Sequence, residues 1–136
     1  MTESPINVVI VDDHEPYRTS LANMLSMEGD LVVVGQGGAS AEAIDLAKLL
    51  QPHLIILDVD MPGGGLEAAA VIARILPATK IIVLTVLLEE RLVQAVQQLG
   101  AHGYLVKGIS ARRLVRALRA VYEGAGFWPS SNAVGL

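Results

Sequence analysis

Two hydrophobic periodicities alternate along this chain of 136 residues. The first is a short run that is apolar at nearly every position and is followed by polar residues or by glycine. Runs of this kind are typical of strands that lie buried on both faces of a parallel sheet. The pattern predicts strands at residues 6–11, 31–35, 54–57, 80–84 and 103–106.

The second periodicity places apolar residues at helical spacing, as in amphipathic helices that cover a sheet. Pro16 stands at a first helical position, and Ser40 and Ser110 are suited to be N-caps. Gly100 is suited to end the fourth helix. The predicted helices are residues 16–28, 40–50, 66–76, 89–99 and 110–123.

Strands and helices alternate strictly, which requires right-handed crossover connections and therefore parallel strands. The prediction is an α/β fold, a doubly wound parallel sheet with the flavodoxin-like strand order 2-1-3-4-5 and helices on both faces. We expect this domain to span residues 1–123. Residues 124–136 lack both periodicities and are predicted to be a linker or tail.

Composition narrows the class of protein. The chain is 52% hydrophobic and carries a formal net charge of −4, with no cysteine. It can bury a sizeable core, and its acidic balance is poorly suited to direct contact with nucleic acid. Without cysteine, disulfides and cysteine-ligated zinc are excluded. Because there is no signal-peptide pattern and no apolar run of the ~20 residues that span a bilayer, we expect a cytoplasmic protein without membrane contact.

Candidate chemistry follows the ends of the predicted strands. Asp12 and Asp13 follow the first strand, Asp58 the third, Thr85 ends the fourth and Lys107 follows the fifth. In an open α/β sheet, ligands bind outside the carboxyl ends of the strands, at the point where the strand order reverses. With the predicted order this crevice lies between the first and third strands, so these side chains should gather there.

Three clustered carboxylates need a compensating cation, because two of them ~4 Å apart repel by roughly 4 kcal/mol at an effective dielectric constant of about 20. Lys107 supplies one positive charge. A hard divalent ion such as Mg²⁺ binds carboxylate oxygens and keeps some of its waters for a phosphate. The cluster is therefore predicted to act on a phosphoryl group, with Thr85 as a donor and a carboxylate as nucleophile.

More than one class of protein uses such parts. Asp58 and Asp60 resemble the paired aspartates of haloacid-dehalogenase-like phosphatases, in which the first attacks phosphorus and the second protonates the leaving group. In that family the acidic pair comes last, whereas here Asp12 and Asp13 come first, so the order disfavours it. A flavodoxin-like flavin binder is disfavoured by the acid cluster, because a phosphate-binding loop needs donors there.

In their present order, the same parts resemble the receiver domain of bacterial two-component response regulators. The resemblance rests on VVIVDDHEPYR (8–18), LIILDVDMPGG (54–64), IIVLT (81–85) and GYLVKG (103–108). It covers about residues 6–123 and is similar in particular to receivers that precede LuxR-type (NarL/FixJ-like) helix-turn-helix domains.

The resemblance implies a switch rather than an enzyme that turns over a substrate. Asp58 would accept a phosphoryl group from a sensor histidine kinase, with only self-catalysed transfer and slow autodephosphorylation. Asp12, Asp13 and Asp58 would hold Mg²⁺ together with the backbone carbonyl of Asp60.

The resemblance also implies how the signal is held and passed on. Lys107 and Thr85 would bind the phosphoryl group, and Thr85 with Tyr104 would form the switch that carries the change outward. The side chains of Asp60 and Leu87 are hypothesised to tune the lifetime of the signal.

The chain departs from the family pattern at three loops. In one of them Gly108 follows Lys107, where many receivers have a proline with a cis peptide bond, and we expect a trans bond. Leu87 and Leu88 stand where polar or acidic residues are common, and Leu88 is predicted to enter the core at the start of the fourth helix. The loop that contains Gly63–Gly65 is one residue shorter than the family commonly has, and we expect its glycines to make up the difference.

A receiver acts by changing its contacts, so partners are part of the prediction. Arg112, Arg116 and Arg119 share one predicted helix, either as a solvated face or as an interface, for example of a homodimer formed on phosphorylation. Control of transcription would require a DNA-binding domain beyond these residues, and DNA would be contacted only through it. A single-domain receiver that acts by protein–protein contact is the alternative.

Overall fold

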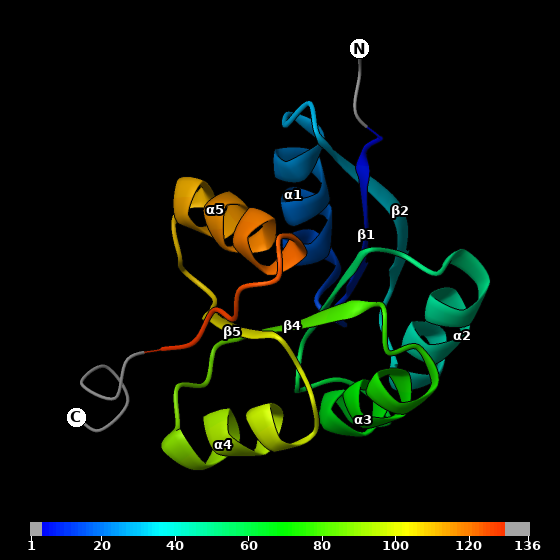
Figure 1. The fold of residues 1–136 in the computed structure, drawn as a ribbon, viewed down its shortest axis with the longest axis vertical. Helices are drawn as coiled ribbons and strands as arrows, with labels where there is room; N and C mark the ends of the chain where they lie inside the picture. Colours follow the sequence, from blue (N-terminus) through cyan, green and yellow to red (C-terminus); the bar gives the residue numbers. More distant parts are fainter. Residues whose placement is uncertain (1–3, 130–136) are drawn as a thin grey trace.

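The computed structural model describes residues 4–129 (Figure 1). At its centre lies a five-stranded parallel sheet of order β2-β1-β3-β4-β5, which confirms the predicted fold and topology. The strands are β1 (Ile6–Val11), β2 (Leu31–Gly37), β3 (Leu54–Leu57), β4 (Lys80–Thr85) and β5 (Gly103–Val106). The helices are α1 (Glu15–Ser26), α2 (Ser40–Leu50), α3 (Gly65–Ile75), α4 (Glu90–Gln98) and α5 (Ala111–Tyr122).

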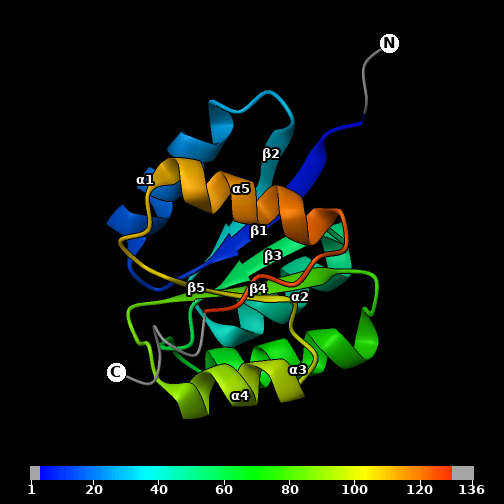
Figure 2. The ribbon, with the colours of Figure 1, turned by 60° about the vertical axis from the view of Figure 1, so that its left-hand side comes forward.

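Helices cover both faces of the sheet, so the fold has three layers (Figures 1 and 2). α1 and α5 pack on one face, where Leu25 and Leu118 are fully buried. α2, α3 and α4 pack on the other face, where Ala47, Ile72 and Val96 are fully buried. Because both faces are covered, the ends of the strands are the places where side chains can meet a ligand.

Local signals set several helix ends as predicted. Pro16 is the second residue of α1, one position later than predicted, and still lies in the first turn, where its missing N–H has no helical partner to lose. The Ser110 hydroxyl accepts a hydrogen bond from the Arg113 N–H and caps α5. Gly100 follows α4 with a φ of +101°. Within residues 4–129 no helix is both long enough and apolar enough to cross a membrane.

Two expectations about these elements were wrong. Ser40 is not an N-cap: Ala39 holds that position, and Ser40 is buried in the first turn with its N–H donated to the Pro62 carbonyl. β2 is not buried on both faces, since Val32 and Val34 are exposed. β2 is an edge strand that pairs with β1, so one of its faces is less covered than those of the central strands.

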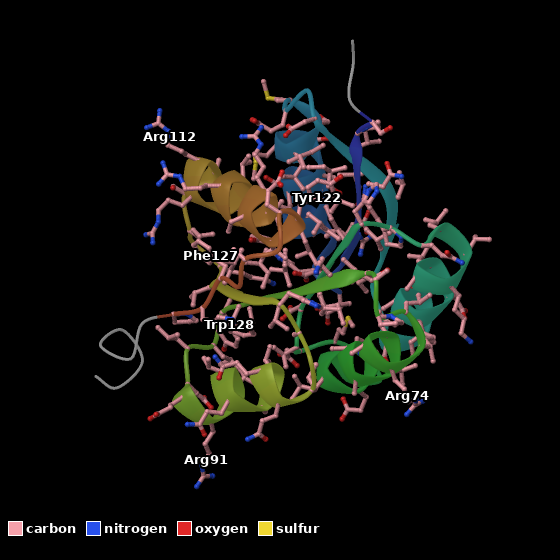
Figure 3. All side chains as sticks on the ribbon, viewed as in Figure 1. Arg74, Arg91, Arg112, Tyr122, Phe127 and Trp128 are labelled. Carbon is pink, nitrogen blue, oxygen red and sulfur yellow. The ribbon has the colours of Figure 1, made fainter. Side chains whose placement is uncertain are left out.

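The segment after α5 returns along the edge of the sheet beside β5. The Phe127 N–H donates to the His102 carbonyl at 3.2 Å, and the Tyr104 N–H donates to the Phe127 carbonyl at 2.8 Å. Figure 3 shows Phe127 toward α5 and Trp128 toward α4, and each packs against the core on its side. Part of the predicted tail therefore contacts the sheet, and residues 130–136 lie outside the described residues.

Candidate functional site

The candidate site lies at the carboxyl ends of β1 and β3, where the strand order reverses. These strands are neighbours, and their last residues, Val11 and Leu57, are paired. The residues that follow, Asp12 and Asp58, therefore emerge side by side, and both are buried. The backbone places these two carboxylates together as the sequence predicted.

Asp13 completes a cluster of three carboxylates. Ligand oxygens of Asp12, Asp13 and Asp58 all lie within 4.8 Å of one another, with Asp13 the exposed member. One Asp12 oxygen accepts the His14 N–H at 2.9 Å, which orients that carboxylate. Three oxygen ligands at this spacing, two of them buried, fit a hard divalent cation such as Mg²⁺.

Lys107, which follows β5, is the cation within the cluster. Its Nζ lies 2.6 Å from Asp12 Oδ2 and 3.1 Å from Asp58 Oδ2. Burial alone would lower the pKa of Lys107, but its hydrogen bonds to Asp12 and Asp58 outweigh burial and raise the pKa. The ammonium therefore stays charged and bridges the two buried carboxylates.

Thr85 and Tyr104 meet at one residue of the loop between β4 and α4. The Thr85 hydroxyl accepts the Leu87 N–H at 3.3 Å, and the Tyr104 hydroxyl donates to the Leu87 carbonyl. Burial raises the pKa of Tyr104 to about 12, so its hydroxyl remains a donor. The prediction that Leu88 enters the core was wrong: it is 38% exposed, because α4 begins only at Glu90.

Two residues of α1 at this site were missed by reasoning from the sequence. Lys107 Nζ lies over the Tyr17 ring, 4.5 Å from its centroid. Arg18 Nη1 donates to the Asp12 carbonyl at 2.7 Å and to the Gly37 carbonyl at 3.2 Å, which ties the ends of β1 and β2 together. Their one signal in the sequence was a position in the first turns of the helix that follows the acidic pair.

The glycine loop between β3 and α3 brings that helix against the acid cluster. Gly63 and Gly64 have φ values of +85° and +86°, which favour glycine. A Cβ on Gly65 would collide with the Asp58 carbonyl oxygen, so the helix starts in direct backbone contact with the strand end. The Asp60 N–H donates to Asp58 Oδ1 at 3.2 Å, while the Asp60 side chain is exposed.

The three arginines predicted as an interface have different surroundings. Arg119 Nη2 lies 2.8 Å from Asp30 Oδ1 and 2.9 Å from Glu28 Oε1, so it pairs within the domain. Arg112 and Arg116 are exposed, and Figure 3 shows Arg112 pointing away from the body of the protein. Arg112 and Arg116 are therefore the better placed of the three for contact with a partner.

A doubly wound parallel sheet that gathers an acid cluster and a lysine at its strand ends has the architecture expected of a receiver. The family model described as response regulator receiver domain matches residues 8–119, and the chain belongs to this family. This confirms the receiver interpretation over the phosphatase and flavin-binding alternatives. Receivers of this family are signalling domains rather than classical enzymes.

The chain is 40% identical over 120 residues to response regulator GacA of Pseudomonas aeruginosa and 40% identical over 129 residues to response regulator UvrY of Escherichia coli K12. These alignments cover 88% and 94% of this chain but 56% and 59% of the relatives. The chain thus spans little more than half the length of the curated relatives it matches.

Solved structures agree with this assignment. The signal receiver domain of the putative response regulator NarL from Mycobacterium tuberculosis has a TM-score of 0.86 at 30% identity, over 90% of this chain and 99% of that one. The isolated REC domain of RcsB from Salmonella enterica, in the presence of phosphomimetic BeF3−, has a TM-score of 0.85 at 30% identity, over 96% and 97% of the two chains.

Proposed function

We propose that this receiver is switched by phosphorylation of Asp58. The observation that carries the proposal is the Lys107 ammonium, which lies 2.6 Å from Asp12 and 3.1 Å from Asp58 within the cluster of three carboxylates. A charged donor beside a buried carboxylate is well placed to bind the oxygens of a phosphoryl group on that carboxylate. Membership of the receiver family supports the same role.

In the proposed transfer, an Asp58 carboxylate oxygen attacks the phosphorus of a phosphohistidine in a sensor histidine kinase. An O–P bond forms as the P–N bond breaks, and the leaving imidazole nitrogen takes up a proton. Asp12, Asp13 and Asp58 would hold Mg²⁺ with the Asp60 backbone carbonyl, and bound Mg²⁺ would neutralise charge on the transferring group. Apart from this self-catalysed transfer and slow autodephosphorylation, we propose no catalytic turnover.

The phosphoryl group would act on the hydrogen bonds that Thr85 and Tyr104 both make to the backbone of Leu87. It adds a charge of roughly −1.5 to −2 beside Lys107 and the Thr85 hydroxyl. The Thr85 hydroxyl accepts the Leu87 N–H and can donate its own proton to the phosphoryl group, so a Thr85 that moves toward the phosphoryl group would draw Leu87 with it. The Tyr104 hydroxyl donates a hydrogen bond to the carbonyl of the same residue. One movement of the loop would therefore reposition Tyr104, and the exposed side chains of Asp60 and Leu87 would tune the lifetime of the state.

In the whole protein, we propose that a receiver of residues 1–123 controls transcription in the cytoplasm, with residues 124–136 leading to a DNA-binding domain. The relatives GacA and UvrY are longer response regulators, and RcsB dimers have been solved bound to DNA. Direct DNA contact by the receiver is disfavoured by its net charge of −4. A second copy of the chain would dock through the face that carries Arg112 and Arg116.

The test is incubation with Mg²⁺ and acetyl phosphate, followed by intact mass spectrometry. The expected result is one phosphoryl adduct per chain, absent from Asp58→Asn and from samples with excess EDTA. Asp60→Asn is the matched control, which should keep the adduct because its backbone carbonyl is unchanged. Phosphate-ester hydrolysis without an adduct, or an adduct that persists in Asp58→Asn, would contradict the proposal.

The role of the Asp60 side chain is tested by comparing the dephosphorylation rates of Asp60→Asn and the parent. Equal rates would show that this side chain does not tune the lifetime of the phosphorylated state.

A further inference from the structure

Lys107 has a third neighbour besides its two carboxylates. A lysine ammonium has three N–H donors, and Asp12 and Asp58 lie 2.6 and 3.1 Å from its Nζ. The same Nζ lies over the face of the Tyr17 ring, 4.5 Å from the centroid. The face of an aromatic ring carries negative potential and attracts a cation at this distance. Tyr17 therefore provides an attractive surface beside the lysine that the two carboxylates bind.

The fold fixes the position of this ring. Tyr17 lies near the start of α1 and packs against the core on the α5 face of the sheet. It lines a small groove together with Ile109 and Leu114, at the start of α5. Ile109 belongs to the same loop as Lys107, so the tyrosine and the loop that carries the lysine line the same groove. The contact with the lysine is made by the face of the ring.

We propose that Tyr17 is a positioning residue for phosphoryl transfer, whose ring holds the Lys107 ammonium beside Asp58. The inference rests on the proposed function of this site. A lysine side chain carries a compact charge at the end of a flexible four-carbon stem, so its ammonium samples several positions unless its neighbours restrict it. With the ring on one side, the ammonium is already ordered when a phosphoryl donor arrives, and this lowers the barrier to transfer.

A role in packing alone predicts a different order of variants. Tyr17→Phe keeps the ring, Tyr17→Trp keeps a better cation-binding face in a larger volume, and Tyr17→Leu keeps apolar volume without such a face. If the ring acts on Lys107, the rate of phosphorylation by acetyl phosphate should stay within about twofold for Tyr17→Phe and Tyr17→Trp. It should fall about five- to tenfold for Tyr17→Leu. If only packing mattered, Tyr17→Leu would stay near the parent and Tyr17→Trp would be slowest.

Two controls separate a local effect from a general disturbance. Tyr122→Leu removes a tyrosine whose ring contacts His53 at a centroid distance of 5.4 Å, and it should leave the rate unchanged. The Mg²⁺ affinity of Tyr17→Leu, measured as stabilisation against thermal unfolding, should equal that of the parent, because the three carboxylates are untouched.

The outcomes distinguish this inference from the function on which it rests. A Tyr17→Leu chain that is phosphorylated as fast as the parent, or one that also loses Mg²⁺ affinity, overturns the positioning role and leaves the proposed function standing. A parent chain that takes up no phosphoryl group overturns the proposed function itself.

Discussion

At the scale of single residues, Asp13 is the exposed member of the acid cluster, and its effect depends on the cation present. Its carboxylate lies within 4.8 Å of ligand oxygens of Asp12 and Asp58, which are both buried. Without a divalent ion, Asp13 adds repulsion to the pair that Lys107 bridges. With such an ion, the same carboxylate would become a ligand.

Asp13→Asn should therefore stabilise the chain in EDTA by about 1 kcal/mol, a modest value because solvent screens an exposed charge. The same variant should lose most of the stabilisation that Mg²⁺ gives the parent. Urea unfolding in EDTA and in Mg²⁺ measures both effects. Asp45→Asn, which changes an exposed acid on α2, should respond to Mg²⁺ as the parent does. An Asp13→Asn chain that behaves like Asp45→Asn would contradict the assignment of Asp13 to the site.

His102 has a structural role just before β5. Its ring Nδ1 accepts the Ile81 N–H at 3.0 Å, and its backbone N–H donates to the Ile81 carbonyl at 2.8 Å. Burial, with a smaller effect from Lys80, lowers the pKa of His102 below 6.5. Because only an unprotonated nitrogen can accept a hydrogen bond, the folded state favours the neutral ring.

The contribution of His102 to the unfolding free energy should be fully present above about pH 6.5. It should be lost as the pH falls through the lower pKa of the folded state, since the unfolded chain binds the proton first. His102→Asn keeps an acceptor but cannot titrate. As the pH falls from about 7.5 to about 5, its unfolding free energy should therefore rise relative to that of the parent. Urea titrations across this range measure the difference, and parallel curves would show that His102 does not contribute.

At the scale of elements, the junction of β3 and α3 is the closest backbone approach at the site. A Cβ on Gly65 would meet the Asp58 carbonyl oxygen, a backbone atom that cannot move without displacing the end of β3. Gly65→Ala should therefore lower the unfolding free energy by about 2–3 kcal/mol and slow phosphoryl uptake. Gly29→Ala is the matched control, because no atom lies within 4 Å of its Cβ position, and it should be neutral within about 0.5 kcal/mol. Urea unfolding of the two variants decides, and equal stabilities would refute the close contact.

How well the limits of an element could be predicted depended on the residues that flank it in the sequence. The predicted ranges of β3 and β5 match the structure, because each is a short apolar run with polar or glycine neighbours. β2 continues to Gly37, past its apolar run, because backbone pairing with β1 does not require apolar side chains. Leu88 was misplaced because an apolar residue ahead of a helix has the same pattern as the first core position of that helix.

The residues of the site also differ in how far the sequence predicts their positions. Asp12, Asp58 and Lys107 were predictable because strand order and strand ends place them together through the backbone alone. The contacts of Tyr17 and Arg18 were not, because they depend on how α1 lies against the sheet and how far each side chain reaches. Hydrophobic periodicity indicates which face of a helix is buried, but it carries no information about the angle at which the helix crosses the sheet.

At the scale of the whole molecule, the segment after α5 links the site to the chain that follows. The backbone of Phe127 is hydrogen-bonded to the backbone of His102 and Tyr104, and the Trp128 side chain packs against the core cluster that contains Tyr104. A groove of about 590 Å³ between β5, its following loop and this segment is lined by Tyr104, Lys107 and Trp128, among others. A movement of Tyr104 would therefore change the surroundings of Trp128.

Trp128 is the one tryptophan in the sequence, so its fluorescence reports on this contact. Beryllofluoride with Mg²⁺ should change its emission in a saturable way, because in the proposed switch a phosphoryl mimic on Asp58 would recruit Thr85 and move the loop to which the Tyr104 hydroxyl is hydrogen-bonded. The change should be absent from Asp58→Asn and smaller in Tyr104→Phe, which keeps the ring but loses the hydrogen bond to Leu87. If beryllofluoride leaves the emission constant in a chain that acetyl phosphate does phosphorylate, the segment after α5 does not sense the switch, and the signal must leave the domain by another face.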